Sequence, residues 1–329
     1  MITERIDLWE KDEYKYEAAY GFVPNIRTYM HEDNEERPSI LVIPGGAYCM
    51  VVPSEGEFIA RKFYDRGMNT FVLTYTTDIT TAFPLYKQPL KDASRAVSMV
   101  RKVLTERGLK DSKIFVMGFS AGGHLAGCMG VHYFDEEIEA AALKGFSNKP
   151  DGAILSYPVV TMGEFTENFS KLNLVGPNPT GELEDYFSVE KQVTDKTVPF
   201  FIWATAKDGL VPCENSLLLS MALKSKWIMH ELHIFNHGDH GLSYPNEEFF
   251  NGINYGDYTF EQVNRAVRAV KDGTAVNVTP RRTQELINQF SDEPKDEPKD
   301  KPEAPKVNVD EFKDILSWAD MAEAFMRKI

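Results

Sequence analysis

The sequence has few cysteines and no long apolar run. Its 329 residues contain three cysteines, Cys49, Cys128 and Cys213, which cannot form the paired framework of a small secreted domain. The first residues lack the basic segment and the long apolar run of a signal peptide. No apolar stretch reaches the roughly eighteen residues that a membrane span requires. These absences predict a protein of the reducing cytoplasm that does not insert into a membrane.

Positive charge is also scarce. Lysine and arginine total 36, against 50 aspartate and glutamate residues, for a formal net charge of −14. This balance argues against nucleic acid or an anionic membrane as a partner. With 43% hydrophobic residues the chain can bury a large core, most simply as one α/β domain with additional segments. The composition leaves the oligomeric state undetermined.

The most informative segment is residues 114–127. A short apolar run leads into Gly118-Phe-Ser120-Ala-Gly122, and a small-residue helix pattern follows at once. This strand–turn–helix context is what a nucleophile elbow requires, because the serine sits on a turn too tight for large side chains two residues before and after it. The helix after Ser120 also aims free backbone N–H groups at whatever the serine attacks. The alternative is a glycine-rich turn with an incidental serine.

A nucleophilic serine needs a base, an orienting acid and an oxyanion site. Residues 199–205 are predicted to form a buried strand, and Asp208 follows it as the candidate acid. The next strand, residues 227–235, is followed by a glycine-containing loop with two histidines. His240 is the candidate base, and His237 is the alternative.

Other acids and a metal site are weaker interpretations. Asp195 lies before its strand, and Asp239 is adjacent to His240, where side chains rarely face each other. Four histidines, His230, His233, His237 and His240, lie close enough in sequence to suggest a metal site. His230 and His233, however, lie on a predicted strand and would point to opposite sides of it. No carboxylate or cysteine completes a zinc spacing, so no metal is predicted.

The oxyanion element is predicted upstream. Residues 39–43 form a candidate strand, and Pro44-Gly45-Gly46-Ala-Tyr48 follows immediately. Glycines after an early strand let bare backbone N–H groups approach a developing oxyanion. Gly45, Gly46 and the N–H of Ala121 are the candidate donors. A Pro-Gly-Gly sequence alone is often only a turn.

The rest of the chain alternates strands and helices. This pattern predicts a mostly parallel, doubly wound sheet with helices on both faces. Residues 161–197 interrupt the alternation and are predicted to be a small cap over the site, or else a surface loop. We expect strands near residues 3–9, 26–30, 70–75 and 152–156, and helices near residues 55–66, 90–108 and 214–226.

Residues 244–308 are predicted to be an insertion into a core formed by residues 1–243 and 309–329. Thr259-x-x-Gln262 is typical of a capping box that opens a helix, and Thr279-Pro280 opens another. Residues 291–306 hold ten charged residues and four prolines and are expected to be a solvated linker. After it an apolar stripe resumes at helical spacing, which predicts a terminal helix packed on the sheet.

The motifs resemble those of an α/β-hydrolase serine esterase of the hormone-sensitive-lipase-like branch. The similarity is greatest to bacterial acetyl-xylan and feruloyl esterase-like carbohydrate esterases, whose oxyanion motif reads Pro-Gly-Gly-x-Tyr. It covers residues 1–243 and the terminal helix, and it departs from many relatives at Ala47, where they have glycine, and after His240. Four segments carry it: Ile43-Pro-Gly-Gly-Ala-Tyr48, Gly118-Phe-Ser-Ala-Gly-Gly-His-Leu-Ala126, Asp208-Gly-Leu-Val-Pro-Cys-Glu-Asn-Ser216 and His237-Gly-Asp-His-Gly-Leu-Ser243.

The resemblance implies an esterase without a cofactor that acts on small acyl esters, with acetylated xylo-oligosaccharides or other acetylated sugars as substrates. It assigns Ser120, Asp208 and His240 as nucleophile, acid and base, and Gly45, Gly46 and Ala121 as oxyanion donors. Aromatic residues near these motifs are candidates for stacking on a sugar, or else core residues: Tyr48, Phe119, Tyr157 and Trp203. Two alternatives remain, a serine peptidase of the same fold and a non-catalytic binding protein.

Overall fold

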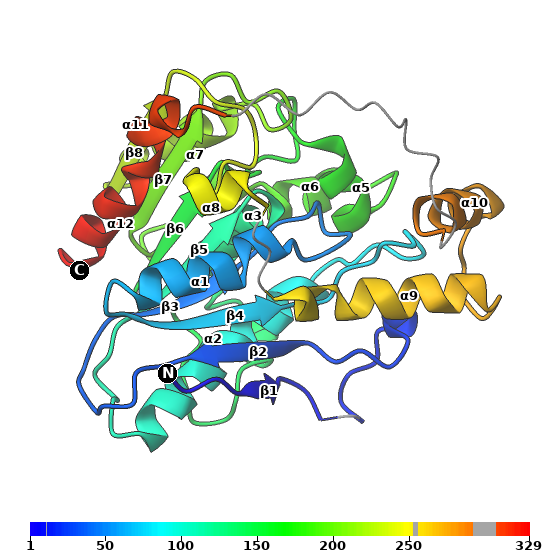
Figure 1. Ribbon diagram of the computed structural model, residues 1–329, viewed down its shortest axis with the longest axis horizontal. Helices are drawn as coiled ribbons and strands as arrows, with labels where there is room; N and C mark the ends of the chain where they lie inside the picture. Colours follow the sequence, from blue (N-terminus) through cyan, green and yellow to red (C-terminus); the bar gives the residue numbers. More distant parts are fainter. Residues whose placement is uncertain (11, 253–255, 292–306) are drawn as a thin grey trace.

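In the described residues, eight strands form one sheet at the centre of the molecule (Figure 1). The computed structural model describes residues 1–329 except 11, 253–255 and 292–306. The strand order is β1-β2-β4-β3-β5-β6-β7-β8. The strands are β1 (Arg5–Asp7), β2 (Asn25–Tyr29), β3 (Ser39–Ile43), β4 (Asn69–Thr74), β5 (Ile114–Phe119), β6 (Gly152–Ser156), β7 (Phe200–Thr205) and β8 (His230–Phe235).

The sheet is mostly parallel, as predicted. β1 and β2 pair antiparallel, and β2 joins β4 antiparallel, while every other pairing is parallel. Strands β3 to β7 are buried along their whole length, which is why they appear in the sequence as continuous apolar runs. The carboxyl ends of the parallel strands β3, β5, β7 and β8 lie at one edge, where the predicted site residues follow them.

Helices cover both faces of the sheet (Figure 1). On one face α2 (Gln88–Glu106), α3 (Ala121–His132) and α7 (Glu214–Ser225) bury Val97, Leu125, Leu219 and their neighbours in the largest apolar cluster. On the other face α1 (Glu57–Tyr64) and α12 (Trp318–Met326) form a second cluster. Within the described part of the chain, no helix combines the length and the apolar character needed to cross a bilayer.

The predicted cap, residues 161–197, contains two short helices. They are α5 (Asn168–Val175) and α6 (Gly181–Phe187), followed by a 3-10 turn at Val189–Lys191. Asn173 of α5 donates to the carbonyl of Ala47 at 2.7 Å, so this segment is tied to the loop that follows β3. Its assignment as a cap stays a prediction.

The predicted insertion packs against the loop that follows β4. It contains α8 (Glu247–Phe250), α9 (Glu261–Lys271) and α10 (Pro280–Gln289). Val263, Val267 and Leu286 bury their side chains with Ile79 in a third apolar cluster. The domain boundaries at residues 243 and 309 stay predictions, and most of the predicted linker, residues 291–306, lies outside the described residues.

The two predicted helix starts in this segment differ. Thr279 caps α10 as expected, its hydroxyl accepting from the N–H of Arg282 at 3.2 Å. The capping box at Thr259 and Gln262 is wrong: the side-chain oxygen of Gln262 accepts from the N–H of Thr77 at 2.9 Å, and its amide donates to the Thr77 carbonyl. A tertiary contact with the β4 loop has replaced the local one.

The terminal helix α12 packs on the sheet, as the apolar stripe predicts. Trp318 is fully buried and stacks on Trp203 of β7, with ring centroids 5.3 Å apart. Its indole N–H donates to the carbonyl of Ser243 at 2.9 Å, which ties the helix to the loop that carries His240.

We expect Trp318→Ala to lower the free energy of unfolding by about 3–5 kcal/mol, because it leaves a cavity in the second cluster. Urea denaturation followed by circular dichroism measures this loss. Trp227→Ala is the matched control, since Trp227 is 82% exposed. Equal unfolding midpoints for the Trp318 variant and the wild type would show that α12 is dispensable for stability.

Candidate active site

Ser120 occupies a sharp turn between β5 and α3. Its φ of 53° lies in the left-handed region, where a side chain other than glycine is strained. A Cβ on Gly118 would lie 2.1 Å from the Gly122 carbonyl oxygen, and one on Gly122 would lie 2.1 Å from that of Ile43. Both positions therefore require glycine. The turn has the steric properties that the sequence motif predicts for a nucleophile elbow.

Three side chains form one hydrogen-bonded chain. The Ser120 hydroxyl lies 2.8 Å from Nε2 of His240, and Nδ1 of His240 lies 2.7 Å from Oδ2 of Asp208. Because the carboxylate can only accept, Nδ1 donates to Asp208 and Nε2 is left to accept the serine proton. The Asp208 side chain is fully buried and that of His240 is 14% exposed. This is the geometry of a serine nucleophile, its base and an orienting acid.

Backbone contacts fix the acid and the base. Oδ1 of Asp208 accepts from the N–H groups of Leu210 and Val211 at 2.9 and 2.8 Å. Asp239 does not reach the imidazole. Its carboxylate accepts instead from the backbone N–H groups of Gly209 and His240, which lowers the pKa of Asp239 and ties the two loops together.

The alternative base and acid lie elsewhere. His237 is bonded through Nε2 to the carbonyl of Glu311 at 2.7 Å, so it is turned toward the C-terminal segment. Asp195 is exposed and precedes β7, so it lies at the opposite end of that strand from Asp208.

The oxyanion prediction needs one correction. The N–H of Gly45 already donates to Oε2 of Glu55 at 2.8 Å, so it is not free for an oxyanion. Among the described residues, the N–H groups of Gly46, Ala47 and Ala121 have no acceptor. Gly46 and Ala121 thus remain candidate donors, and Ala47 joins them.

Glu55 is a site residue that the sequence analysis missed. It is 5% exposed and borders the same cavity as Ser120. One carboxylate oxygen accepts from Gly45 and the other accepts from the Tyr157 hydroxyl at 2.7 Å. The Tyr157 ring lies edge-on to His240 with centroids 4.9 Å apart. Glu55 therefore links the oxyanion loop to the aromatic support of the base, and its burial raises the pKa of its carboxyl.

The four aromatic residues, interpreted from the sequence as sugar-stacking candidates or else core residues, are core residues. Their side chains are at most 2% exposed. Phe119, Tyr157 and Trp203 belong to the cluster that packs on α12, on one side of the sheet. Tyr48 donates to Nδ1 of His124 at 2.7 Å, and burial lowers the pKa of His124 to about 4, which keeps that ring neutral.

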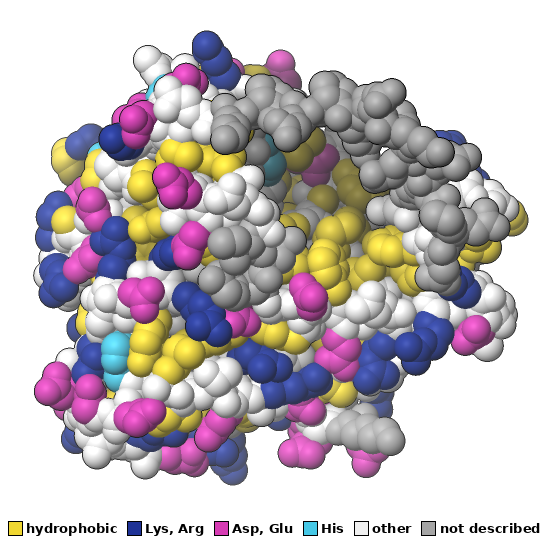
Figure 2. Space-filling model, viewed as in Figure 1, with side chains coloured by type: hydrophobic (Ala, Val, Ile, Leu, Met, Phe, Trp, Pro, Cys, Tyr) yellow, Lys and Arg dark blue, Asp and Glu magenta, His cyan; other side chains and the backbone are white. Residues whose placement is uncertain are grey.

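The surface that faces Ser120 is formed by other residues. A cavity of about 470 Å³ contains Ser120 and His240, and it lies open to solvent. Figure 2 shows hydrophobic side chains gathered in a hollow on this face of the molecule, above the position of α9 in Figure 1. The cavity lining includes Cys49, Met50, Glu167, Phe169 and Leu210.

The chain gives little signal for these lining residues. Glu167 and Phe169 lie in the segment predicted to be a cap, and Leu210 lies within the Asp208 motif, two residues after the aspartate. Of these residues, only Leu210 could have been predicted from the sequence, because it lies so close to Asp208. Glu55 lies at the start of the predicted first helix, where an acidic residue is ordinarily explained as a helix-terminal charge.

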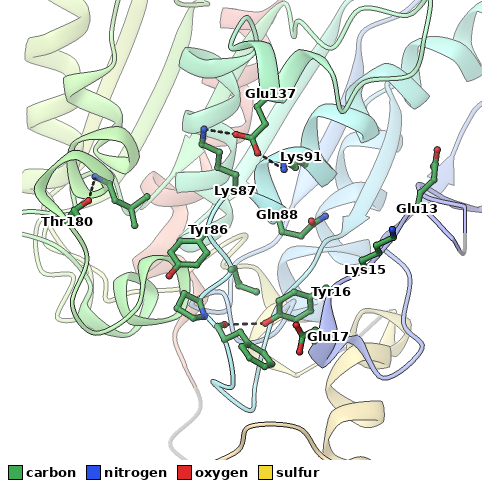
Figure 3. A pocket seen from close by; sticks show the side chains of 14 residues that line it. Glu13, Lys15, Tyr16, Glu17, Tyr86, Lys87, Gln88, Lys91, Glu137 and Thr180 are labelled. Atoms are coloured by element: carbon green, nitrogen blue, oxygen red, sulfur yellow. Dashed lines mark hydrogen bonds and ion pairs between the residues drawn. The ribbon is translucent and has the colours of Figure 1, made fainter.

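A larger cavity lies away from the triad. Its volume is about 650 Å³, and it is bordered by the N-terminal segment, the start of α2 and α6 (Figure 3). Lys87 and Lys91 both pair there with Glu137, at 2.9 and 2.6 Å. The single carboxylate of Glu137 compensates one of these two positive charges, and Ser120, His240 and Asp208 are absent from the lining of this cavity.

The histidines of β8 do not converge. His230 contacts Ser220 of α7 at 3.0 Å, and His233 packs on Phe201 with centroids 5.3 Å apart. They lie on opposite sides of the sheet, as strand geometry predicts. In the described ranges, no group of three or more histidine, cysteine and carboxylate residues could hold a metal ion.

Comparison with known proteins gives the chain its family. Residues 27–223 match the family model BD-FAE. In sequence, the chain is 50% identical over 266 residues to endo-1,4-beta-xylanase B of Butyrivibrio fibrisolvens, and 25% identical over 224 residues to an acetylxylan esterase of Xylanibacter ruminicola. These alignments cover 81% and 64% of this chain, and 42% of each relative. The chain thus matches less than half the length of either protein.

A solved structure extends the likeness to three dimensions. The acetyl ester-xyloside bifunctional hydrolase of Caldicellulosiruptor lactoaceticus is 33% identical, with a TM-score of 0.67. The match covers 82% of this chain and 97% of that one. The predicted α/β-hydrolase class is confirmed by this likeness and by the sheet. The chain therefore belongs to the BD-FAE family of the α/β-hydrolase fold, among relatives that include carbohydrate esterases.

Proposed function

We propose that the chain is a serine carboxylic ester hydrolase in which Ser120, His240 and Asp208 are nucleophile, base and orienting acid. The hydrogen-bonded chain from Ser120 through His240 to Asp208 is the observation that carries the proposal. A nucleophilic serine, an imidazole nitrogen that can accept its proton and a buried carboxylate that orients the imidazole are the side chains that acyl transfer through serine uses.

The reaction proceeds in two halves. His240 takes the proton of Ser120 as its oxygen attacks the ester carbonyl, and Asp208 stabilises the imidazolium that forms. The N–H groups of Gly46, Ala47 and Ala121 are the donors available for the tetrahedral oxyanion. His240 then returns the proton to the leaving alcohol, and an acyl group remains on Ser120. Water, activated by the same imidazole, releases the acid.

The proposed substrates are acetylated xylo-oligosaccharides. This assignment rests on two relatives, one an acetylxylan esterase and the other an acetyl ester-xyloside hydrolase. The open cavity beside Ser120 supports it, because a bulky alcohol can leave toward solvent without passing through the protein.

The two alternatives make different predictions. A peptidase of the same fold is represented by acylamino-acid-releasing enzyme 1 of Oryza sativa, but at 25% identity and over only 30% of that protein. A non-catalytic binding protein would have no need of the strained Ser120 turn. A fluorophosphonate probe labels an activated serine, and acetyl-sugar and peptide substrates then separate esterase from peptidase.

Replacement of the nucleophile is the first test of the proposal. We expect Ser120→Ala to keep the fold and to lower ester hydrolysis by on the order of 10⁴-fold or more. Turnover of 4-nitrophenyl acetate, with circular dichroism as the folding control, measures this. A variant that retains more than about a tenth of the wild-type kcat would refute the role of Ser120.

The second test concerns acyl length. We expect faster turnover of an acetyl than of an octanoyl ester, because a long chain would cover the half-buried carboxylate of Glu167 in the cavity lining. The comparison uses matched 4-nitrophenyl esters below their solubility limits. Faster hydrolysis of the octanoyl ester would contradict the assignment to small acyl groups.

The third test concerns Glu55 as a positioning residue. We expect Glu55→Ala to lower kcat on the order of 10²-fold with a smaller change in KM, because the oxyanion loop and Tyr157 lose their common support. Glu55→Gln should retain most of the activity, since its oxygen can accept from Gly45 while its amide donates to the Tyr157 hydroxyl.

A pH series of unfolding tests the burial of the Glu55 carboxyl, while the split between kcat and KM tests its positioning role. Because burial raises the pKa of Glu55, the folded state binds its proton more tightly, and the free energy of unfolding falls as pH rises from the ordinary carboxyl value through the raised pKa. The Gln variant should lack this contribution to the slope. Equal activity of the Ala variant and the wild type would refute the positioning role.

A further inference from the structure

Three cavities adjoin one another along α5. The cavity that contains Ser120 shares Phe169 with a second cavity of about 220 Å³. The second shares Thr81 and Leu172 with a third, of about 260 Å³. We call the second and third cavities together the α5 groove. The shared residues place the groove next to the proposed catalytic site, with Phe169 between them.

One wall of the groove is an apolar stripe on α5. Phe169 and Leu172 are 36% and 39% exposed, and three residues of helix place them on the same face. The opposite side of the helix is buried, with Ser170 and Leu174 each at 1% exposure. The helix thus has a buried face and, in addition, two large apolar side chains that stay exposed beside the site.

The other wall is polar and comes from α10. Thr279, Arg281, Arg282 and Glu285 line the second cavity. The Arg281 side chain is 91% exposed and bonds to Glu285 at 2.9 Å. The groove therefore offers hydroxyl, guanidinium and carboxylate groups opposite an aromatic ring.

Both walls are fixed to the catalytic loops. Asn173 donates to the carbonyl of Ala47 at 2.7 Å, which joins α5 to the oxyanion loop. Arg282 donates twice to the carbonyl of Ile79, at 2.9 and 2.7 Å, and Asn277 donates to that of Ala82 at 2.5 Å. A ligand in the groove would consequently bind a prearranged surface rather than order a loose one.

We propose that the α5 groove binds sugar units of the leaving group, beyond the unit that carries the ester, with Phe169 as the stacking platform. The proposal rests on the proposed esterase function. A sugar ring has apolar C–H faces that suit Phe169 and Leu172, and hydroxyls that suit the α10 wall. A fatty acyl chain is the poorer fit, because it can make no hydrogen bonds to the hydroxyl, guanidinium and carboxylate groups of the α10 wall.

The first experiment compares substrates of different length. The ratio of kcat/KM for acetylated xylotriose to that for 4-nitrophenyl acetate should fall about tenfold in Phe169→Ala, and by roughly threefold in Arg281→Ala. Trp227→Ala, an exposed aromatic far from the groove lining, and Ile287→Ala, on α10 but outside the lining, should keep the wild-type ratio. A loss of octanoyl-ester rather than oligosaccharide turnover in the groove variants would overturn the proposal.

The second experiment is independent of catalysis. Isothermal titration of the full chain carrying Ser120→Ala with unacetylated xylotriose should give a Kd that rises about tenfold when Phe169→Ala is added. An unchanged Kd, or no binding at all, would overturn the groove proposal even if acetyl esters are hydrolysed. Binding in a chain whose wild type hydrolyses no ester would support the groove and refute the esterase function.

Discussion

The contact between the first turn of α3 and the end of β3 is the constraint on which the site depends. Gly122 lies so close to this strand that a Cβ would come within 2.1 Å of the Ile43 oxygen and 2.4 Å of the Pro44 oxygen. Gly45 is pressed against the same turn, with its Cβ position 2.9 Å from that of Ser120. Ser120 and the glycine loop that follows β3 are thus neighbours because two backbones touch. Side chains added at either glycine would separate them.

Much of the fold and the triad was predictable because the relevant signals are local. The glycine spacing around Ser120 follows from the steric demands of a tight turn. Asp208 follows a plainly apolar strand, and His240 lies on the glycine-containing loop after the next strand. The sugar-stacking interpretation of the aromatic residues assumed that residues close to Ser120 in the sequence also face the ligand. Phe119 precedes Ser120 by one residue, yet its side chain belongs to the cluster under α12, because successive strand residues point to opposite faces.

Other features had no local signal. The N–H of Gly45 donates to Glu55, which is ten residues away, and Glu55 also accepts from Tyr157, which is 102 residues farther along the chain. Arg282 binds Ile79 across 203 residues. At Gln262 a local pattern was present but misleading. The sequence is typical of a helix cap, yet the side chain of Gln262 bonds to a distant loop. Such contacts depend on how the helices and strands pack in the tertiary structure, and no short sequence pattern predicts that packing.

The way in which α9 and α10 are attached has a consequence for how substrate range can change. Several of their polar anchors end on main-chain groups of the loop after β4, at Thr77, Ile79 and Ala82. These main-chain groups persist whatever side chains the loop carries, so these attachments do not depend on the side chains that line the groove. Substitutions at Thr81 or along the outer face of α10 can therefore remodel the groove while the helices stay docked and the triad stays undisturbed. The side chains that shape the outer surface of this segment are therefore separate from the groups that hold it against the loop after β4.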